Sequence, residues 1–138
     1  MTNADRHREA HRRFNEREWD SLTEMVSPSV SFHDHPRDIV MNDSDAFVGW
    51  LKGWATTFSD ARVDGADYID AGDWTIARFM GRGLNDGQLG EMPATGKQMN
   101  MPFCEIMHWS DGKIERGELY YDQLTMLTQL GVMQSMPA

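Results

Sequence analysis

The sequence of 138 residues contains one cysteine, Cys104, and no long apolar run. A single cysteine excludes an internal disulfide and any zinc site that is rich in cysteine. No stretch approaches the roughly 20 apolar residues of a membrane span, and the N-terminal residues lack the apolar core of a signal peptide. These absences predict a cytoplasmic protein with no membrane partner.

Positive charge is also scarce, because 13 lysines and arginines face 22 aspartates and glutamates, for a net charge of −9. A protein with this charge repels the phosphate backbone, so no nucleic-acid partner is expected. The arginines near the start alternate with carboxylates, which is typical of a solvated helix face with opposite-charge pairs.

The length fits one domain, which we place over residues 1–138. Eleven methionines and five tryptophans are many for this length. Methionine adapts to irregular apolar shapes, so the composition fits either an ordinary methionine-rich core or a cavity for a flat apolar ligand.

The predicted elements are helices first, then strands. Helical spacing and caps predict a helix from Asn3 or Asp5 to about Arg17, a short helix at 21–26, and a helix from Ser44 or Asp45 to about Phe58. Alternation and glycine-containing turns predict strands at 29–35, 61–72, 73–83, 98–109 and 113–121, before a last helix that begins at Asp122. This order indicates an α+β fold, in which a cone-shaped, curved antiparallel sheet wraps over the N-terminal helices and its open end can hold a ligand.

The turn after Trp109 decides which side chains share a face with Asp122. A two-residue Asp-Gly turn would pair Trp109 with Ile114, whereas a three-residue turn over 110–112 would pair His108 with Ile114. We favour the three-residue turn. It puts His108, Ile106 and Cys104 on the face of Ile114, Arg116, Glu118, Tyr120 and Asp122. The opposite face, with Met101, Phe103, Met107, Trp109, Leu119 and Tyr121, would be apolar and would need a cover, most simply a second subunit.

His33 and His35 share one face of their strand and could chelate a metal. No third ligand has diagnostic spacing, although Glu105, Glu118, His108 and Asp122 are candidates, so we predict no metal. Neither glycine-containing segment follows the pattern of a phosphate loop, and there is no G-x-S-x-G motif. Cys104, in mid-strand, is read as a packed thiol rather than a nucleophile.

Three motifs in the second half point to a family. They are Pro93, Thr95, Gly96 and Lys97 in P-x-T-G-K, the D-G-K-I segment 111–114, and Tyr121-Asp122 followed by Gln129-Leu130-Gly131. Together they resemble the SnoaL-like polyketide cyclases of the nuclear-transport-factor-2-like superfamily. The resemblance implies a cone-shaped α+β barrel, dimeric through its outer sheet face, with an apolar cavity for a small apolar or aromatic organic ligand.

The resemblance also implies an intramolecular aldol cyclisation that uses an aspartate as acid/base and needs no metal or cofactor. Asp122 matches that aspartate, and His33 and His108 match histidines that shape the family's site. We expect further ligand contacts from His35, Trp50, Trp54, Phe58, Met80, Cys104, Glu118 and Tyr120. Gly117 and Glu118 depart from the bulkier residues of the family, which favours a smaller, more polar substrate.

The pKa of Asp122 is open in the sequence, because burial against Tyr120 and the charge of Glu118 would raise it while the helix N-terminus would lower it. Other reactions also stay open. Epoxide hydrolysis could use Arg78 and Asp122, although Met80 stands where a second acid is needed, and dehydration or isomerisation needs only an Asp with a His or Tyr. In a non-catalytic ligand-binding dimer, Asp122 would be only a helix cap.

Overall fold

The computed structural model describes residues 1–134 of the chain. The helices are α1 (Asn3–Asn15), α2 (Trp19–Thr23), α3 (Ser44–Thr57) and α4 (Gln123–Gln129). The strands are β1 (Val26–Asp34), β2 (Ile39–Met41), β3 (Arg62–Ala71), β4 (Trp74–Leu84), β5 (Gln98–Ser110) and β6 (Lys113–Tyr121). No helix in residues 1–134 is both long and apolar enough to cross a membrane.

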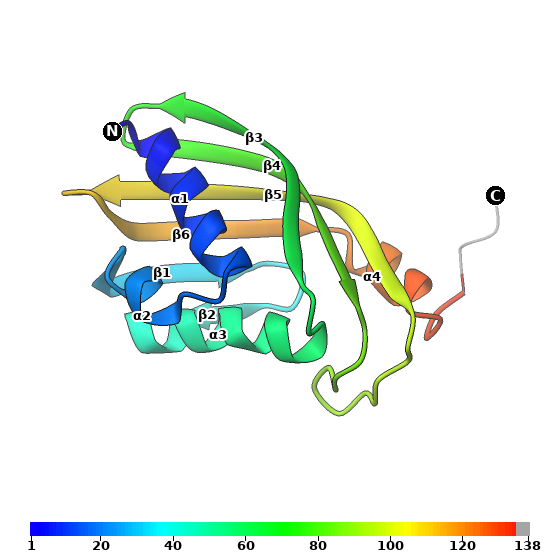
Figure 1. Cartoon of the computed structure of the whole chain (residues 1–138). Coiled ribbons are helices and arrows are strands. Elements are labelled where there is room, and N and C mark those ends of the chain that lie inside the picture. The colour runs from blue at the N-terminus through cyan, green and yellow to red at the C-terminus, as the bar shows by residue number, and fades with distance from the viewer. Residues whose placement is uncertain (135–138) are drawn as a thin grey trace.

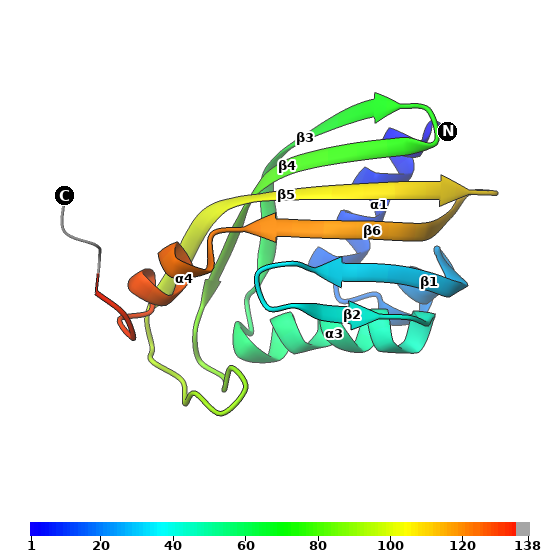
Figure 2. The same cartoon turned by 180° about the vertical axis from the view of Figure 1, so that it is seen from behind.

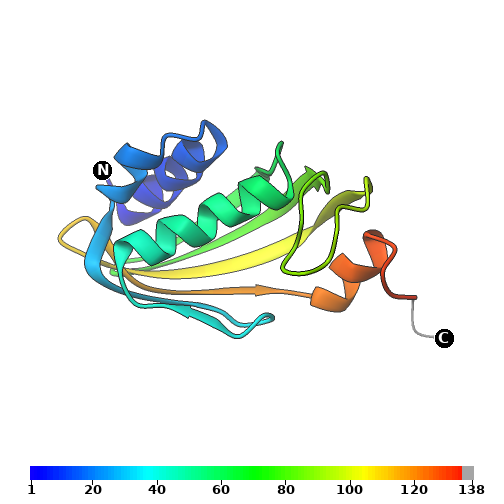
Figure 3. The same cartoon turned by 90° about the horizontal axis from the view of Figure 1, so that it is seen from below.

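All strands join one sheet in the order β2-β1-β6-β5-β4-β3. The long strands β3 to β6 curve together (Figures 1 and 2), and α1, α2 and α3 lie on one face of the sheet (Figure 3). The predicted α+β fold with a curved sheet over N-terminal helices is therefore confirmed. The sheet differs from the prediction in two details: the short strand β2 was not expected, and β1 runs parallel to β6 in an otherwise antiparallel sheet. The second helix, expected at 21–26, is Trp19–Thr23, because β1 already begins at Val26.

Side-chain caps fix the starts of three helices. Thr2 and Asp5 form a reciprocal capping box at α1, with both bonds at 3.0 Å, and Asp43 accepts from the Ala46 amide at the start of α3. Asp122 caps α4 as predicted. The caps of the first and third helices thus lie one to three residues before those expected from sequence, because each segment holds several competent capping residues close together.

The β5–β6 hairpin has a two-residue turn, so the favoured three-residue turn is wrong. Ser110 pairs with Lys113 and Trp109 with Ile114, and both turn residues have positive φ, 51° at Asp111 and 76° at Gly112. Such a turn matches the twist of the strands. A bulge follows, because His108 pairs with Arg116 and Glu115 is therefore an extra residue in β6. This bulge puts His108 on the face of Glu118 and Tyr120. Ile114 lies on the opposite face.

The apolar face of β5 is the inside of the cone. Met101, Phe103, Met107 and Trp109 are at most 6% exposed, and the sheet face they occupy lies under α1 and α3 (Figure 3). The expectation that a second subunit covers this face is therefore wrong, because the chain's own helices cover it.

Gly117 lets an aromatic ring lie directly on this inner face. A Cβ at this position would lie 2.3 Å from Cε2 of the fully buried Phe32 ring. We expect Gly117→Ala to lower the free energy of unfolding by about 1–3 kcal/mol, because the ring has no free space to move into. Urea unfolding measures this change.

Gly49 provides the matched control, since it lies on the exposed side of α3 and a Cβ at this position would have no neighbour within 4 Å. Gly49→Ala should raise the free energy of unfolding by up to about 1 kcal/mol, through helix propensity alone. Equal effects of the two substitutions would contradict the close packing of Phe32 on Gly117.

Candidate functional site

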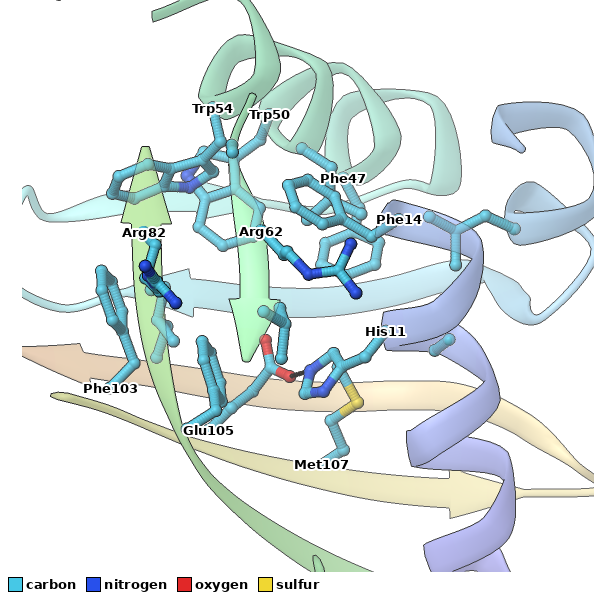
Figure 4. A pocket seen from close by; sticks show the side chains of 18 of the residues that line it. His11, Phe14, Phe47, Trp50, Trp54, Arg62, Arg82, Phe103, Glu105 and Met107 are labelled. Carbon is cyan, nitrogen blue, oxygen red and sulfur yellow. Dashed lines mark hydrogen bonds and ion pairs between the residues drawn. The ribbon is translucent and has the colours of Figure 1, made fainter. Parts of the chain in front are cut away.

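An apolar pocket lies between the helices and the concave face of the sheet (Figure 4). Its cavity volume is about 80 Å³. Aromatic walls come from Phe14, Phe47, Trp50, Trp54, Phe79 and Phe103. Charged or titratable side chains are few: His11 and Glu105 lie inside, while the exposed residues Arg62 and Arg82 lie where the pocket meets solvent.

Glu105 is the polar centre of this pocket. Its Oε1 accepts hydrogen bonds from Nε2 of His7 at 2.9 Å and from Nε2 of His11 at 2.7 Å. Within residues 1–134 its second oxygen has no hydrogen-bond partner in the protein, and Figure 4 shows that oxygen turned toward the pocket interior. One oxygen of the carboxyl is therefore occupied by the two histidines, and the other is available to a ligand.

Hydrogen bonds behind the two histidines fix their orientation. Thr75 Oγ1 lies 2.7 Å from Nδ1 of His7 and accepts from Trp109 Nε1 at 2.8 Å, so its hydroxyl proton is free to point at His7. The Tyr68 hydroxyl lies 2.7 Å from Nδ1 of His11. Both rings thus direct Nε2 toward Glu105.

The cluster is ionised at Glu105 and neutral at His7. Burial opposes ionisation of Glu105, but the charge and hydrogen bond of His11 and the hydrogen bond of His7 outweigh it and lower the pKa of Glu105 to about 2. Burial lowers the pKa of His7, in spite of its bond to Glu105. Burial also raises the pKa of Tyr68, so its hydroxyl keeps its proton at neutral pH.

A second buried carboxylate, Asp34, lies at the end of β1. It is fully buried and accepts from the Tyr121 hydroxyl at 2.9 and 3.1 Å and from Trp50 Nε1 at 3.1 Å. Burial, followed by the charge of Asp34, raises the pKa of Tyr121. These bonds hold Trp50 in the pocket wall and tie α3 to the sheet.

The residues predicted to form one site are spread over separate parts of the fold. Trp50 and Trp54 line the inner pocket, whereas Phe58 is fully buried in the core and does not line it. Contact of Trp50, Trp54 and Phe58 with a ligand stays a prediction.

Four others gather on the outer face of the sheet. The His35 ring stacks on Tyr120, with ring centroids 4.5 Å apart, and lies tilted against His33, with centroids 3.8 Å apart. Its Nε2 lies 3.0 Å from Glu118 Oε1. Nε2 of His33 is bound to Asp38 instead. Within the described part of the chain, no third ligand joins the two histidines in a metal-binding group.

Asp122 is exposed and lines an open depression with Met80, Cys104 and Tyr120. Hydrogen bonds from the Thr125 hydroxyl and amide, and from the Leu124 amide, lower the pKa of Asp122. The direction left open by the sequence is thus downward, because the capping bonds favour the anion.

His108 is distant from Asp122. Tyr121, the neighbour of Asp122, is opposite Phe103, and His108 is five residues farther along β5, so about 16 Å of strand separates His108 from Tyr121 and more separates it from Asp122. His108 packs against Trp74, and its buried Nδ1 has no hydrogen-bond partner in residues 1–134. The structure does not bring Asp122, His33 and His108 together, although their predicted roles remain untested.

His7 and His11 were not predicted as site residues. They share the inner stripe of α1 with Ala10 and Phe14, at the spacing i, i+3, i+4 and i+7, and that spacing was visible in the sequence. The alternating arginines and carboxylates predict one solvated face of this helix, and the histidines on its inner face were not considered. Glu105 was considered only as a possible metal ligand.

Solved structures share the fold that carries this pocket. The putative polyketide cyclase IdmH from Streptomyces antibioticus superposes with a TM-score of 0.81 at 23% identity, over 96% of this chain and 100% of that one. A hypothetical protein with a ketosteroid isomerase-like fold from Catenulispora acidiphila superposes with a TM-score of 0.77 at 16% identity, over 92% and 93% of the two chains. The curved sheet over helices therefore has the fold of these structures.

Sequence comparison gives the family. The model of the SnoaL-like polyketide cyclases matches residues 5–130, and the chain belongs to this family. It is also 33% identical over 87 residues to the aklanonic acid methyl ester cyclase DnrD of Streptomyces peucetius. That match covers 62% of this chain and 58% of the relative, so it spans less than two thirds of the relative's length.

Proposed function

We propose that this protein closes a ring in a small organic molecule by acid/base chemistry in the inner pocket, with Glu105 as the general base. Membership of the cyclase family supports a cyclase-type enzyme. The observation that carries the proposal is a buried, ionised carboxylate whose second oxygen faces an aromatic pocket.

The low pKa of Glu105 limits what it can deprotonate. A carboxylate of this kind is always in the basic form at neutral pH, but it is a weak base. It therefore fits a methylene group that is acidified by two flanking carbonyls rather than an ordinary ketone. We therefore favour a 1,3-dicarbonyl or a β-keto ester as the substrate class.

In the proposed reaction, Glu105 Oε2 takes the C–H proton and leaves an enolate. The enolate carbon attacks a carbonyl of the same molecule, a C–C bond forms, and the protonated Glu105 returns its proton to the new alkoxide. The aromatic walls hold the chain folded, which in well-oriented cases contributes several kcal/mol. Arg62 and Arg82 supply positive charge to oxygen anions near the mouth.

The size of the pocket supports a small substrate. A volume of about 80 Å³ is less than a fused polycyclic system requires, so a large ligand would have to displace the half-buried side chains of Trp50 and Leu51. The relative from Streptomyces peucetius is named for an aklanonic acid methyl ester. For this chain we favour a shorter ester of the same chemical type.

The test uses mass spectrometry of a substrate series. The full chain is incubated with linear and monocyclic β-keto esters, and the products are separated by liquid chromatography. Aldol addition within one molecule leaves the mass unchanged, so we expect a new peak of the same mass that forms only with the protein. A product lighter by one water would support dehydration instead, and an unchanged series with no binding would contradict the proposal.

We further propose that the protein is a homodimer through the outer sheet face. Val40, Ile69, Trp74 and Tyr120 are 39–49% exposed on strands whose register points them outward. Sedimentation at micromolar concentration tests this, and a monomer would refute it. Location in the cytoplasm stays a prediction.

A further inference from the structure

His7, His11 and Glu105 have the composition of a metal site. The histidines lie one turn apart on α1, and Glu105 comes from the centre of β5. The three residues are buried, and their ligand atoms all lie within 4.8 Å of one another. We propose that they bind one divalent transition-metal ion through Nε2 of His7, Nε2 of His11 and Oε1 of Glu105.

The spacing of the ligand atoms is close to what such an ion needs. The two nitrogens lie 2.9 and 2.7 Å from Glu105 Oε1. Bonds of about 2.1 Å to a tetrahedral ion put its ligand atoms about 3.4 Å apart. A small rotation of the Glu105 side chain is therefore enough to admit an ion between the three atoms.

The outer hydrogen bonds of both histidines favour metal binding. Metal-bound histidine normally donates its other ring N–H to a fixed acceptor, which sets the tautomer. Thr75 Oγ1 and the Tyr68 hydroxyl stand 2.7 Å from the two Nδ1 atoms and can accept these bonds. When an ion replaces the Nε2 proton of a neutral histidine, the ring proton moves to Nδ1, so the exchange releases no proton from that ring.

The donor set selects the class of ion. Two imidazoles and one carboxylate suit Zn²⁺, Fe²⁺, Mn²⁺ or Co²⁺, whereas Ca²⁺ and Mg²⁺ prefer oxygen ligands. The buried negative charge of Glu105 would be matched by a cation. His11 and Glu105 line the pocket, which gives the ion an entry path and leaves its open coordination position facing the apolar space.

A bound ion would be compatible with the proposed ring closure, because it uses Oε1 and leaves Oε2 to the pocket. It would supply a Lewis acid next to the base. The metal site does not depend on the proposed reaction, and its test measures binding alone. A protein that binds metal without turning over a keto ester would retain this inference and lose the other.

The test titrates the full chain, produced without a histidine tag and stripped by a chelator, with Zn²⁺ and Co²⁺. We expect one ion per chain by calorimetry, a visible Co²⁺ spectrum typical of low coordination number, and a higher Tm with Zn²⁺. His7→Gln and His11→Gln should each weaken binding more than about 100-fold, and Tyr68→Phe, which removes only the outer hydrogen bond of His11, about 10- to 100-fold.

The paired variant His33→Gln/His35→Gln is the matched control, because it removes the other close pair of histidines, on the outer face. It should bind one Zn²⁺ with unchanged affinity. Circular dichroism identifies any variant that fails to fold. If His7→Gln and His11→Gln fail to fold, the Tyr68→Phe variant still tests the site. The proposal would be overturned if the stripped protein did not bind one Zn²⁺ per chain. It would also be overturned if binding were lost in His33→Gln/His35→Gln and kept in the variants of the inner site.

Discussion

Replacing Glu105 by glutamine should lower turnover of a β-keto ester by about 100-fold or more, the usual contribution of a positioned general base. Glutamine has the same shape and can keep one hydrogen bond to the histidines, but it cannot take a proton. Substrate binding should change little, because the aromatic walls are untouched. Steady-state kinetics should therefore show the loss in kcat rather than in KM.

Asp122→Asn tests the rival hypothesis in the same assay. Asparagine remains a competent helix cap, so the fold should persist. If Asp122 is the acid/base, this variant loses turnover and Glu105→Gln does not. Glu91→Gln, at an exposed loop position, is the carboxylate-to-amide control and should match the unmodified protein.

The protein should lose stability steeply as the pH falls from about 6.5 toward 2. The pKa of Glu105 is about 2 in the folded chain against an ordinary 4.5, so its contribution is complete above pH 4.5 and is lost as the pH falls to 2. A difference of this size corresponds to roughly 3 kcal/mol. The lowered pKa of His7 acts in the same direction below 6.5, because the unfolded chain then binds a proton that the buried ring does not.

Urea unfolding at a series of pH values measures this slope. Glu105→Gln should flatten the acid limb between pH 4.5 and 2, although it lowers stability at neutral pH by removing a charged hydrogen-bond partner. An acid limb of unchanged slope in this variant would mean that other carboxylates cause the acid sensitivity.

Most of the fold could be predicted from the sequence, because its elements have long and regular patterns. The alternation in β4 and β5 and the apolar stripe of α3 are each sustained over more than ten residues. The strand β2 has only three residues and carries no such pattern. The turn of the β5–β6 hairpin was predicted wrongly for a different reason. Asp111-Gly112 suits two turn lengths, and no sequence pattern indicates the bulge after it.

The site was harder to predict, because it depends on which face of the sheet is inside. An Asp that caps a helix and two half-buried histidines, His33 and His108, matched family positions, and the structure places them outside the pocket. Glu105 is two residues from both Phe103 and Met107 on β5, so it shares their face. A charged residue in this apolar row was not considered as a catalytic residue. Its partners come from the opposite end of the chain, and only the packing of α1 on the sheet brings them together.

The parallel pairing of β1 with β6 has a consequence for how the chain folds. Ser31 pairs with Arg116, and the His35 amide donates to the Leu119 carbonyl, so this edge of β1 pairs with a strand that follows only after β2, β3, β4 and β5 in the chain. Contacts between such distant segments are slow to form. Until they form, the edge of β1 that faces β6 has unpaired backbone groups, and a nascent chain that stalls before β6 is prone to aggregate through that edge.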